Sequence, residues 1–153
     1  MLGIGNPIKS DDAIGLRVAE RVRDMGLKGV TVEEESTSGL EIIDIIMDYE
    51  RVIVIDAIST GRHAPGKVSL HRPEEFDHMV MPGSSHEINI FTALEMGKRI
   101  SPERMPRDLC LVAIEAKDLE TISERLTPEL ERAIPEAVRV VLDLVQDQKS
   151  REA

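Results

Sequence analysis

The chain is poor in cysteine and lacks long apolar runs, and each shortage excludes a class of protein. Its 153 residues include one cysteine, which excludes an internal disulfide and a cysteine metal cage. Cys110 stands in the apolar run LCLV and is predicted to be a small buried side chain. No run approaches the ~18 apolar residues of a membrane span, and no leader pattern opens the chain, so we expect a cytoplasmic protein.

Basic residues are also scarce. Lys and Arg number 19 against 29 Asp and Glu, which gives a formal net charge of −10. A broad phosphate-binding surface needs the opposite sign, so neither nucleic acid nor a membrane is an expected partner. There is no G-x-S-x-G elbow and no Walker loop, and Ile8 stands where a dinucleotide-binding loop opening at Gly3 would have its third glycine.

Residues 3–15, GIGNPIKSDDAIG, organise the rest of the chain. The two glycines before Asn6 and the proline after it predict that a strand ends in a tight turn. Ser10, Asp11 and Asp12 offer cap acceptors for a helix over residues 11–25. The sequence therefore predicts a carboxylate pair at a strand-to-helix turn, the edge where open α/β sheets build their sites.

Strands and helices alternate along the chain. We expect strands at 2–5, 30–33, 52–55, 67–71 and 109–114, and helices at 11–25, 40–47, 84–99 and from 127 to about 145. Either Pro135 kinks the last helix or the regular helix begins near it. The predicted fold is a single domain over 1–153: a three-layer α/β/α sandwich around a mostly parallel, twisted sheet of about five strands. Its edge strand, 67–71, runs antiparallel. We expect the first strand to be truncated at its start and 146–153 to be a frayed polar tail.

Three side chains of this fold are candidates for a site. Asp11 or Asp12 follows the first strand, Asp56 ends the strand 52–55, and His86 falls in the first turn of the helix that Ser84 and Glu87 would cap. Two carboxylates and an imidazole suit a divalent ion such as Zn²⁺ or Ni²⁺. Each residue also has a plainer interpretation: a helix cap for either acid of the pair, a surface turn for Asp56, and a surface or capping histidine for His86. Spacing alone does not bring the three together.

Residues 3–15, followed by VIDA at 54–57, SH at 85–86, LVAIE at 111–115 and LTP at 126–128, resemble the hydrogenase maturation protease family over nearly the whole chain. The resemblance implies a phosphorylase/hydrolase-like fold. It also implies an endopeptidase that removes the C-terminal extension of a nickel-iron hydrogenase large subunit precursor after nickel insertion. By position, Asp12, Asp56 and His86 would contact the metal and serve catalysis. The nickel would be carried by the precursor, with no tightly bound cofactor of the enzyme's own.

One segment departs from the family pattern. Relatives carry an acid-Gly-Gly-Thr-x-Gly segment where residues 34–39 are EESTSG, so only Thr37 and Gly39 match this substrate loop. Losing two glycines predicts a stiffer loop. Two other functions remain open. One is a peptidyl-tRNA hydrolase, because the opening segment resembles that family, although the family's His-Asn pair is absent from this chain. The other is a non-catalytic chaperone that checks nickel loading. Cleavage of a precursor distinguishes the chaperone from the protease.

Overall fold

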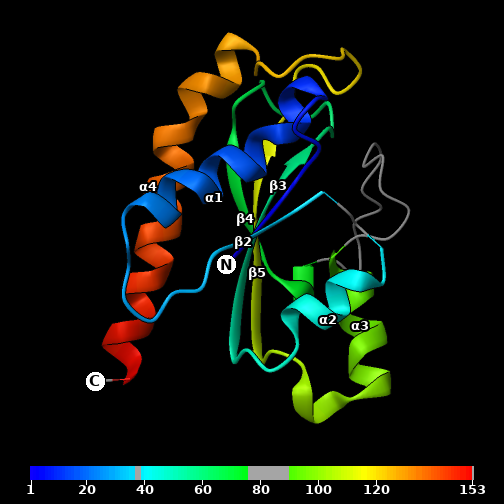
Figure 1. Cartoon of the computed structure of the whole chain (residues 1–153), viewed down its shortest axis with the longest axis vertical. Coiled ribbons are helices and arrows are strands. Elements are labelled where there is room, and N and C mark those ends of the chain that lie inside the picture. The colour runs from blue at the N-terminus through cyan, green and yellow to red at the C-terminus, as the bar shows by residue number, and fades with distance from the viewer. Residues whose placement is uncertain (37–38, 76–89, 153) are drawn as a thin grey trace.

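The computed structural model describes residues 1–36, 39–75 and 90–152, which form a five-stranded sheet with helices on both sides (Figure 1). The strands are β1 (Leu2–Ile4), β2 (Glu33–Glu35), β3 (Arg51–Ile58), β4 (Val68–His71) and β5 (Asp108–Glu115). Their order is β2-β1-β3-β5-β4, and all neighbours are parallel except β4, which pairs antiparallel with β5 at one edge. The predicted sheet, including its antiparallel edge strand, is confirmed.

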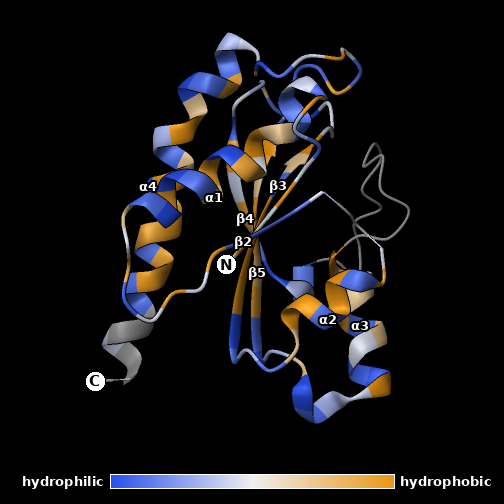
Figure 2. Ribbon diagram, in the orientation of Figure 1, coloured by the Kyte–Doolittle hydropathy of each residue, from blue (hydrophilic) through white to orange (hydrophobic). Residues whose placement is uncertain are grey.

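Four α-helices cover the described sheet: α1 (Ile14–Asp24), α2 (Glu41–Ile46), α3 (Ile90–Ile100) and α4 (Pro128–Glu152). Helices α1 and α4 pack together over one face, and α2 and α3 pack together over the other. Figure 2 shows the apolar stripes of these helices turned toward the strands, so the three predicted layers are confirmed. Among the described residues, no helix has both the length and the apolar character needed to cross a membrane.

The central strand β3 is buried on both faces, as its β-branched run predicts. Ile53 and Ile55 belong to the core under α1 and α4, whereas Val52 and Val54 belong to the core under α2 and α3. Burying each such aliphatic side chain contributes on the order of 1.5–3 kcal/mol. The two cores therefore fix which face of β3 each residue occupies, including Asp56 near the carboxyl end of the strand.

The second strand lies later in the sequence than predicted. The alternating residues Val30 and Val32 are only partly buried against the core, and the strand is the acidic β2, three glutamates long. The position of β2 along the chain is set by its pairing with β1, because Leu2 pairs with Glu33 and the Gly5 amide donates to the Glu35 carbonyl at 3.0 Å. On this edge strand Glu33 is exposed and Glu34 and Glu35 are only half-buried, so the poor strand propensity of glutamate is tolerated there.

The first helix also begins differently. Residues 10–13 form a 3₁₀ turn, η1 (Ser10–Ala13), and α1 follows at Ile14, so the prediction of one helix over 11–25 is wrong at its start. Ser10 takes a positive φ of 48°, which an α-helix cannot contain. Within the described part of the chain neither η1 nor α1 has a side-chain cap, so the capping role proposed for Ser10, Asp11 and Asp12 is wrong.

Further boundaries are corrected. Strand β5 includes Glu115, and β3 continues past Asp56 to Ile58, because the two strands pair without interruption to the pair Ile58–Glu115. Helix α4 begins at Pro128 and runs through Pro135 to Glu152, so the expected frayed tail is helical and a helix start near Pro135 is excluded. Helix α3 is described from Ile90; residues 76–89 lie outside the described part of the chain.

The single cysteine is fully buried in β5, as predicted. Burial raises the pKa of the Cys110 thiol from 9.0 to about 11, which lowers its thiolate fraction at pH 8 about 100-fold. We therefore expect the native protein to react with an aromatic disulfide reagent at least ~100-fold more slowly than the urea-unfolded chain. Stopped-flow absorbance measures both rates. Equal rates would mean that β5 opens readily, contrary to its central place in the sheet.

Candidate functional site

Two glycines allow the start of α1 and the turn before it to pack closely against the ends of β1 and β3. A Cβ added at Gly15 would clash with the main-chain oxygens of Ile4 and Ile55, and one added at Gly5 would clash with that of Asp12. Neither glycine has a positive φ. Gly5 and Gly15 are therefore needed for the close approach of η1 and α1 to the strands, and the sharp-turn role predicted for Gly5 is not what requires a glycine there.

Asp12 lies in η1, directly above this contact, and its side chain is 3% exposed. Its Oδ2 accepts a hydrogen bond from the Asn6 amide at 2.9 Å, and its own amide donates to the Lys9 carbonyl at 3.1 Å. Because η1 also contacts β3, Asp12 stands at the carboxyl end of β1 and beside the neighbouring strand. The carboxylate is thus held at the sheet edge that the sequence predicted.

Asp56 is half-buried near the carboxyl end of β3, one residue beyond the Gly3–Ile55 pair that joins β3 to β1. Its Oδ1 accepts a hydrogen bond from the following amide, that of Ala57, at 2.8 Å. By alternation it shares a face with Val54 and Ile58, the face that α2 and α3 cover. Asp12 and Asp56 are therefore both at the carboxyl ends of neighbouring parallel strands, although Asp56 lies within its strand and does not terminate it.

The remaining predicted residues are only partly observed. His86 and Thr37 lie outside the described residues. Gly39 lies two residues before α2; its carbonyl accepts the Ile42 amide at 3.2 Å, and a Cβ at this position would meet no atom of the described residues closer than 3.9 Å. Within the described ranges, no three His, Cys, Asp or Glu side chains gather in a group able to hold a metal ion.

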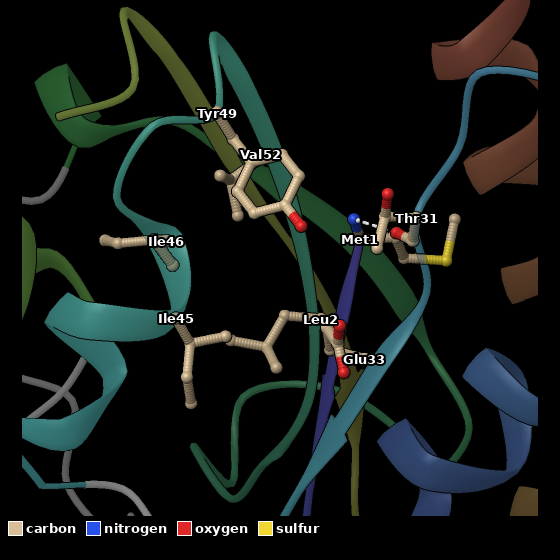
Figure 3. Close-up of a pocket in the computed structure, with 8 residues that line it drawn as sticks. All are labelled: Met1, Leu2, Thr31, Glu33, Ile45, Ile46, Tyr49 and Val52. Atoms are coloured by element: carbon tan, nitrogen blue, oxygen red, sulfur yellow. Dashed lines mark hydrogen bonds between the residues drawn. The ribbon is translucent and has the colours of Figure 1, made fainter. Parts of the chain in front are cut away.

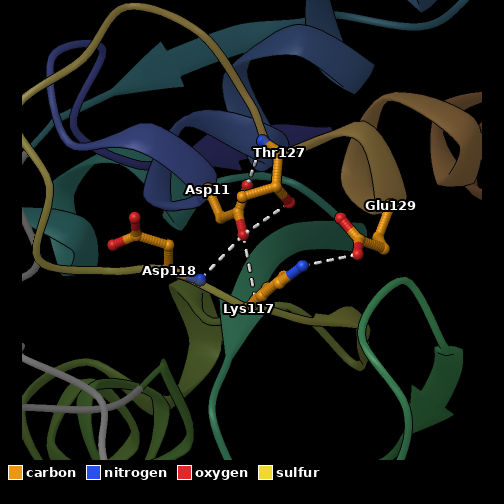
Figure 4. A network of polar contacts seen from close by, with 5 residues as sticks. All are labelled: Asp11, Lys117, Asp118, Thr127 and Glu129. Atoms are coloured by element: carbon orange, nitrogen blue, oxygen red, sulfur yellow. Dashed lines mark hydrogen bonds and ion pairs between the residues drawn. The ribbon is translucent and has the colours of Figure 1, made fainter.

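Asp11, the other acid of the pair, is fully buried and accepts four hydrogen bonds (Figure 4). Its Oδ2 accepts the amides of Lys117 and Asp118, each at 2.9 Å, and the Thr127 hydroxyl at 3.0 Å. Its Oδ1 accepts the Thr127 amide at 2.7 Å. Asp11 thus joins η1 to both ends of the loop that leads from β5 to α4. Sequence reasoning assigned it a cap or ligand role and missed these partners, because they lie more than 100 residues away.

A second buried carboxylate secures the neighbouring loop. Glu115, at the end of β5, is 2% exposed; its Oε1 accepts the amides of Thr60 and Gly61 at 2.8 and 2.9 Å, and its Oε2 accepts the Thr60 hydroxyl at 2.9 Å. These bonds fix the chain just after β3. An acid at the end of an apolar strand was the sequence signal for this contact, since a buried carboxylate must be hydrogen-bonded.

The loop between β5 and α4 is further stabilised by exposed charges. Hydrogen bonds from Thr121 and from the amide of Glu120 lower the pKa of Asp118, and the bond from Lys117 lowers that of Glu129. A depressed carboxyl pKa contributes stability above the unfolded value and loses it as pH falls through the folded value. Near neutral pH both contributions are present, although solvent screening keeps them small.

A shallow hollow with little enclosed space lies at the opposite end of β1 (Figure 3). Met1, Leu2 and Tyr49 are among its lining residues, and the Met1 amine donates to the Thr31 carbonyl at 2.9 Å. Burial lowers the pKa of this amine. Because η1 follows the other end of the strand, the hollow is separate from the edge that holds Asp12 and Asp56.

The two carboxylates have the chemistry of cation ligands. Asp12 lies in the turn after β1 and Asp56 near the end of the adjacent strand β3, next to loops that buried Asp11 and Glu115 hold in place, and carboxylate oxygens are the ligands that hard cations prefer. A carboxylate at such an edge can also take a proton from water.

Known proteins resemble this chain in sequence and in fold. A sequence model described as hydrogenase maturation protease matches residues 16–144. The hydrogenase 2 maturation protease of Escherichia coli is 29% identical over 153 residues, covering 96% of this chain and 90% of that protein. The hydrogenase expression/formation protein HupD of Bradyrhizobium diazoefficiens is 26% identical, with coverages of 96% and 77%. The solved structure of the E. coli hydrogenase maturating endopeptidase HybD superimposes with a TM-score of 0.78 at 27% identity, covering 96% of this chain and 91% of that one.

Proposed function

Because this chain belongs to the hydrogenase maturation protease family and is a peptidase, we propose that it cleaves the C-terminal extension from a nickel-iron hydrogenase large subunit precursor. The reaction would take place in the cytoplasm, after nickel has been inserted. Asp12, Asp56 and His86 would contact the nickel, and Thr37 and Gly39 would lie in the loop that meets the substrate tail.

One observation carries this proposal. Asp12, in the turn after β1, and Asp56, near the end of β3, belong to the carboxyl ends of two adjacent parallel strands, and η1 contacts β3, which supports the proposal. In addition, Asp56 shares the β3 face that α3 covers, and His86 precedes the first described residue of α3 by four positions in sequence. The donor set of two oxygens and one nitrogen suits Ni²⁺ without surrounding it.

An open donor set explains why nickel would act as a recognition element. Nickel carried by the precursor adds ligand bonds to the complex only when the precursor is loaded, so the protease discriminates by a difference of affinities. Each factor of ten in that discrimination requires ~1.4 kcal/mol of additional binding. The free protein need not hold metal tightly for this scheme to work.

Hydrolysis requires a water molecule to add to the scissile carbonyl carbon while the amide C–N bond breaks and the leaving amine gains a proton. We favour a route in which the precursor's nickel polarises the carbonyl and activates the water. In the alternative route, a carboxylate such as Asp56 takes the proton from water and passes it to the amine. Both routes use the same side chains, and the variant assay below measures their joint contribution.

The test is incubation of the purified protein with a nickel-loaded precursor and with its nickel-free form, followed by mass spectrometry of the C-terminus of the precursor. We expect cleavage of the loaded form alone, and its loss in Asp56→Ala and His86→Ala, because each variant removes one of the three proposed contacts. The exposed α2 residue Asp44 provides a matched Asp→Ala control that should cleave normally.

Binding of the loaded precursor without cleavage would instead support a chaperone that checks nickel loading. Equal cleavage of both forms would overturn nickel-gated recognition while leaving the protease function intact. If Asp56→Ala cleaves at the rate of the wild type, Asp56 has no part in the reaction.

A further inference from the structure

The chain just before Asp12 is joined to the loop between β5 and α4 by main-chain hydrogen bonds. The Ser123 amide donates to the Ile8 carbonyl at 3.0 Å, the Ser10 amide donates to the Ser123 carbonyl at 2.9 Å, and the Asp11 amide donates to the Asp118 carbonyl at 3.1 Å. Asp118 returns a bond from its own amide to the Asp11 side chain. Two segments distant in sequence are therefore locked side by side.

The intrinsic conformational preference of the residues does not explain the turn that these hydrogen bonds maintain. Ser10 has a φ of 48°, a left-handed conformation that is unfavourable for a residue with a Cβ, and its side chain is buried. Backbone strain of this kind persists only where surrounding contacts impose it. The contacts around Ser10 are the main-chain bonds above and the four bonds to the carboxylate of Asp11.

We propose that Asp11 is a positioning residue: its buried carboxylate holds the η1 turn against the loop that contains Lys117, Asp118 and Thr127, and thereby fixes the orientation of Asp12. The inference rests on the proposed function, in which Asp12 contacts the nickel of the substrate. We assign Asp11 no contact with the metal, because the residue is fully buried and its carboxylate already accepts four hydrogen bonds, three at Oδ2 and one at Oδ1. The two adjacent acids therefore have different roles in this proposal: Asp11 orients Asp12, and Asp12 contacts the nickel.

Removing a single hydrogen bond tests this with little risk to the fold. Thr127→Val deletes the hydroxyl that donates to Asp11, and Thr127→Ser keeps it. We expect Thr127→Val to lower kcat on loaded precursor about five-fold with KM changed less than two-fold, and Thr127→Ser to restore kcat. Asp11→Asn, which turns an amide NH₂ toward amide donors, should lower kcat about 100-fold.

Thr121 supplies a matched control in the same loop. Its hydroxyl bonds to the side-chain carboxylate of Asp118, whereas only the main-chain amide and carbonyl of Asp118 bond to Asp11, so Thr121→Val removes an equivalent group without removing a bond to Asp11. We expect kcat to stay within 1.5-fold of wild type in this variant. If Thr121→Val lowers kcat as much as Thr127→Val, or Thr127→Ser fails to restore it, the effect is general loosening of the loop and the positioning role is wrong.

A second measurement does not depend on cleavage. The Asn6 amide donates to the carboxylate of Asp12, so its hydrogen exchange measured by NMR reports the orientation of that side chain. We expect exchange at Asn6 to be faster in Thr127→Val and unchanged in Thr121→Val. Unchanged exchange in Thr127→Val would overturn the inference. If the wild type cleaves no precursor while the exchange behaves as expected, the proposed function fails and the positioning of Asp12 stands.

Discussion

Asp12→Asn is expected to lower cleavage of the nickel-loaded precursor about 1,000-fold while the protein stays folded. The amide is nearly the same size as the carboxylate, and its oxygen can still accept the Asn6 amide, so the turn keeps its hydrogen bond. What is lost is the negative charge that would ligate nickel or accept a proton. Initial rates of C-terminal cleavage, with circular dichroism to verify folding, measure the effect.

The control for this variant is Asp24→Asn, an exposed acid at the far end of the helix that follows η1. It changes the net charge by the same amount and should cleave at the wild-type rate. A residual rate above a tenth of wild type in Asp12→Asn would show that Asp12 neither binds the metal nor takes part in hydrolysis.

Gly15→Ala is expected to destabilise the protein by about 3 kcal/mol, out of the ~5–15 kcal/mol typical of a domain. The new Cβ would meet the carbonyl oxygens of Ile4 and Ile55, which belong to two central strands that cannot move independently. Overpacking of this kind costs about 1–3 kcal/mol or more, and the better helix propensity of alanine returns at most ~1 kcal/mol. Urea unfolding monitored by circular dichroism measures the difference.

A matched substitution separates crowding from the loss of glycine itself. At Gly39 an added Cβ has no atom of the described residues closer than 3.9 Å, so Gly39→Ala should stay within ~0.5 kcal/mol of wild type. If Gly15→Ala is equally mild, α1 can lift away from the strands, and the close contact that seats Asp12 is not required for stability.

Sequence patterns predicted the layers better than the boundaries. Continuous apolar runs identified β3 and β5, and alternation identified the antiparallel edge strand, because the pattern of apolar residues within a short segment indicates whether one or both faces of a strand are buried. The acidic strand β2 carries no such signal; pairing with β1 determines it. The turn at Ser10 was missed for the same reason, since distant partners impose a conformation that the residue does not favour.

The candidate site was predicted in part. The sequence placed Asp11 or Asp12 after the first strand and Asp56 at the end of another strand, without showing that they converge; in the structure these two strands are parallel neighbours and η1 contacts β3. The different task of Asp11 was not accessible from its sequence neighbours. From the sequence alone the two adjacent acids cannot be distinguished. In the structure Asp11 accepts four hydrogen bonds, whereas Asp12 lies at the same sheet edge as Asp56. The metal-ligand role of His86 stays a prediction.

The partners of Asp11 lie 106 to 116 residues further along the chain, which has a consequence for biosynthesis. During translation, β1 and its turn leave the ribosome long before Thr127 does, and closing so long a loop must await the later residues. The nascent chain can pair β1 with β3 early, yet it cannot fix Asp12 until the start of α4 has emerged. A ribosome-bound chain that stops short of Thr127 should therefore be incompetent for cleavage, however much of its sheet has already formed.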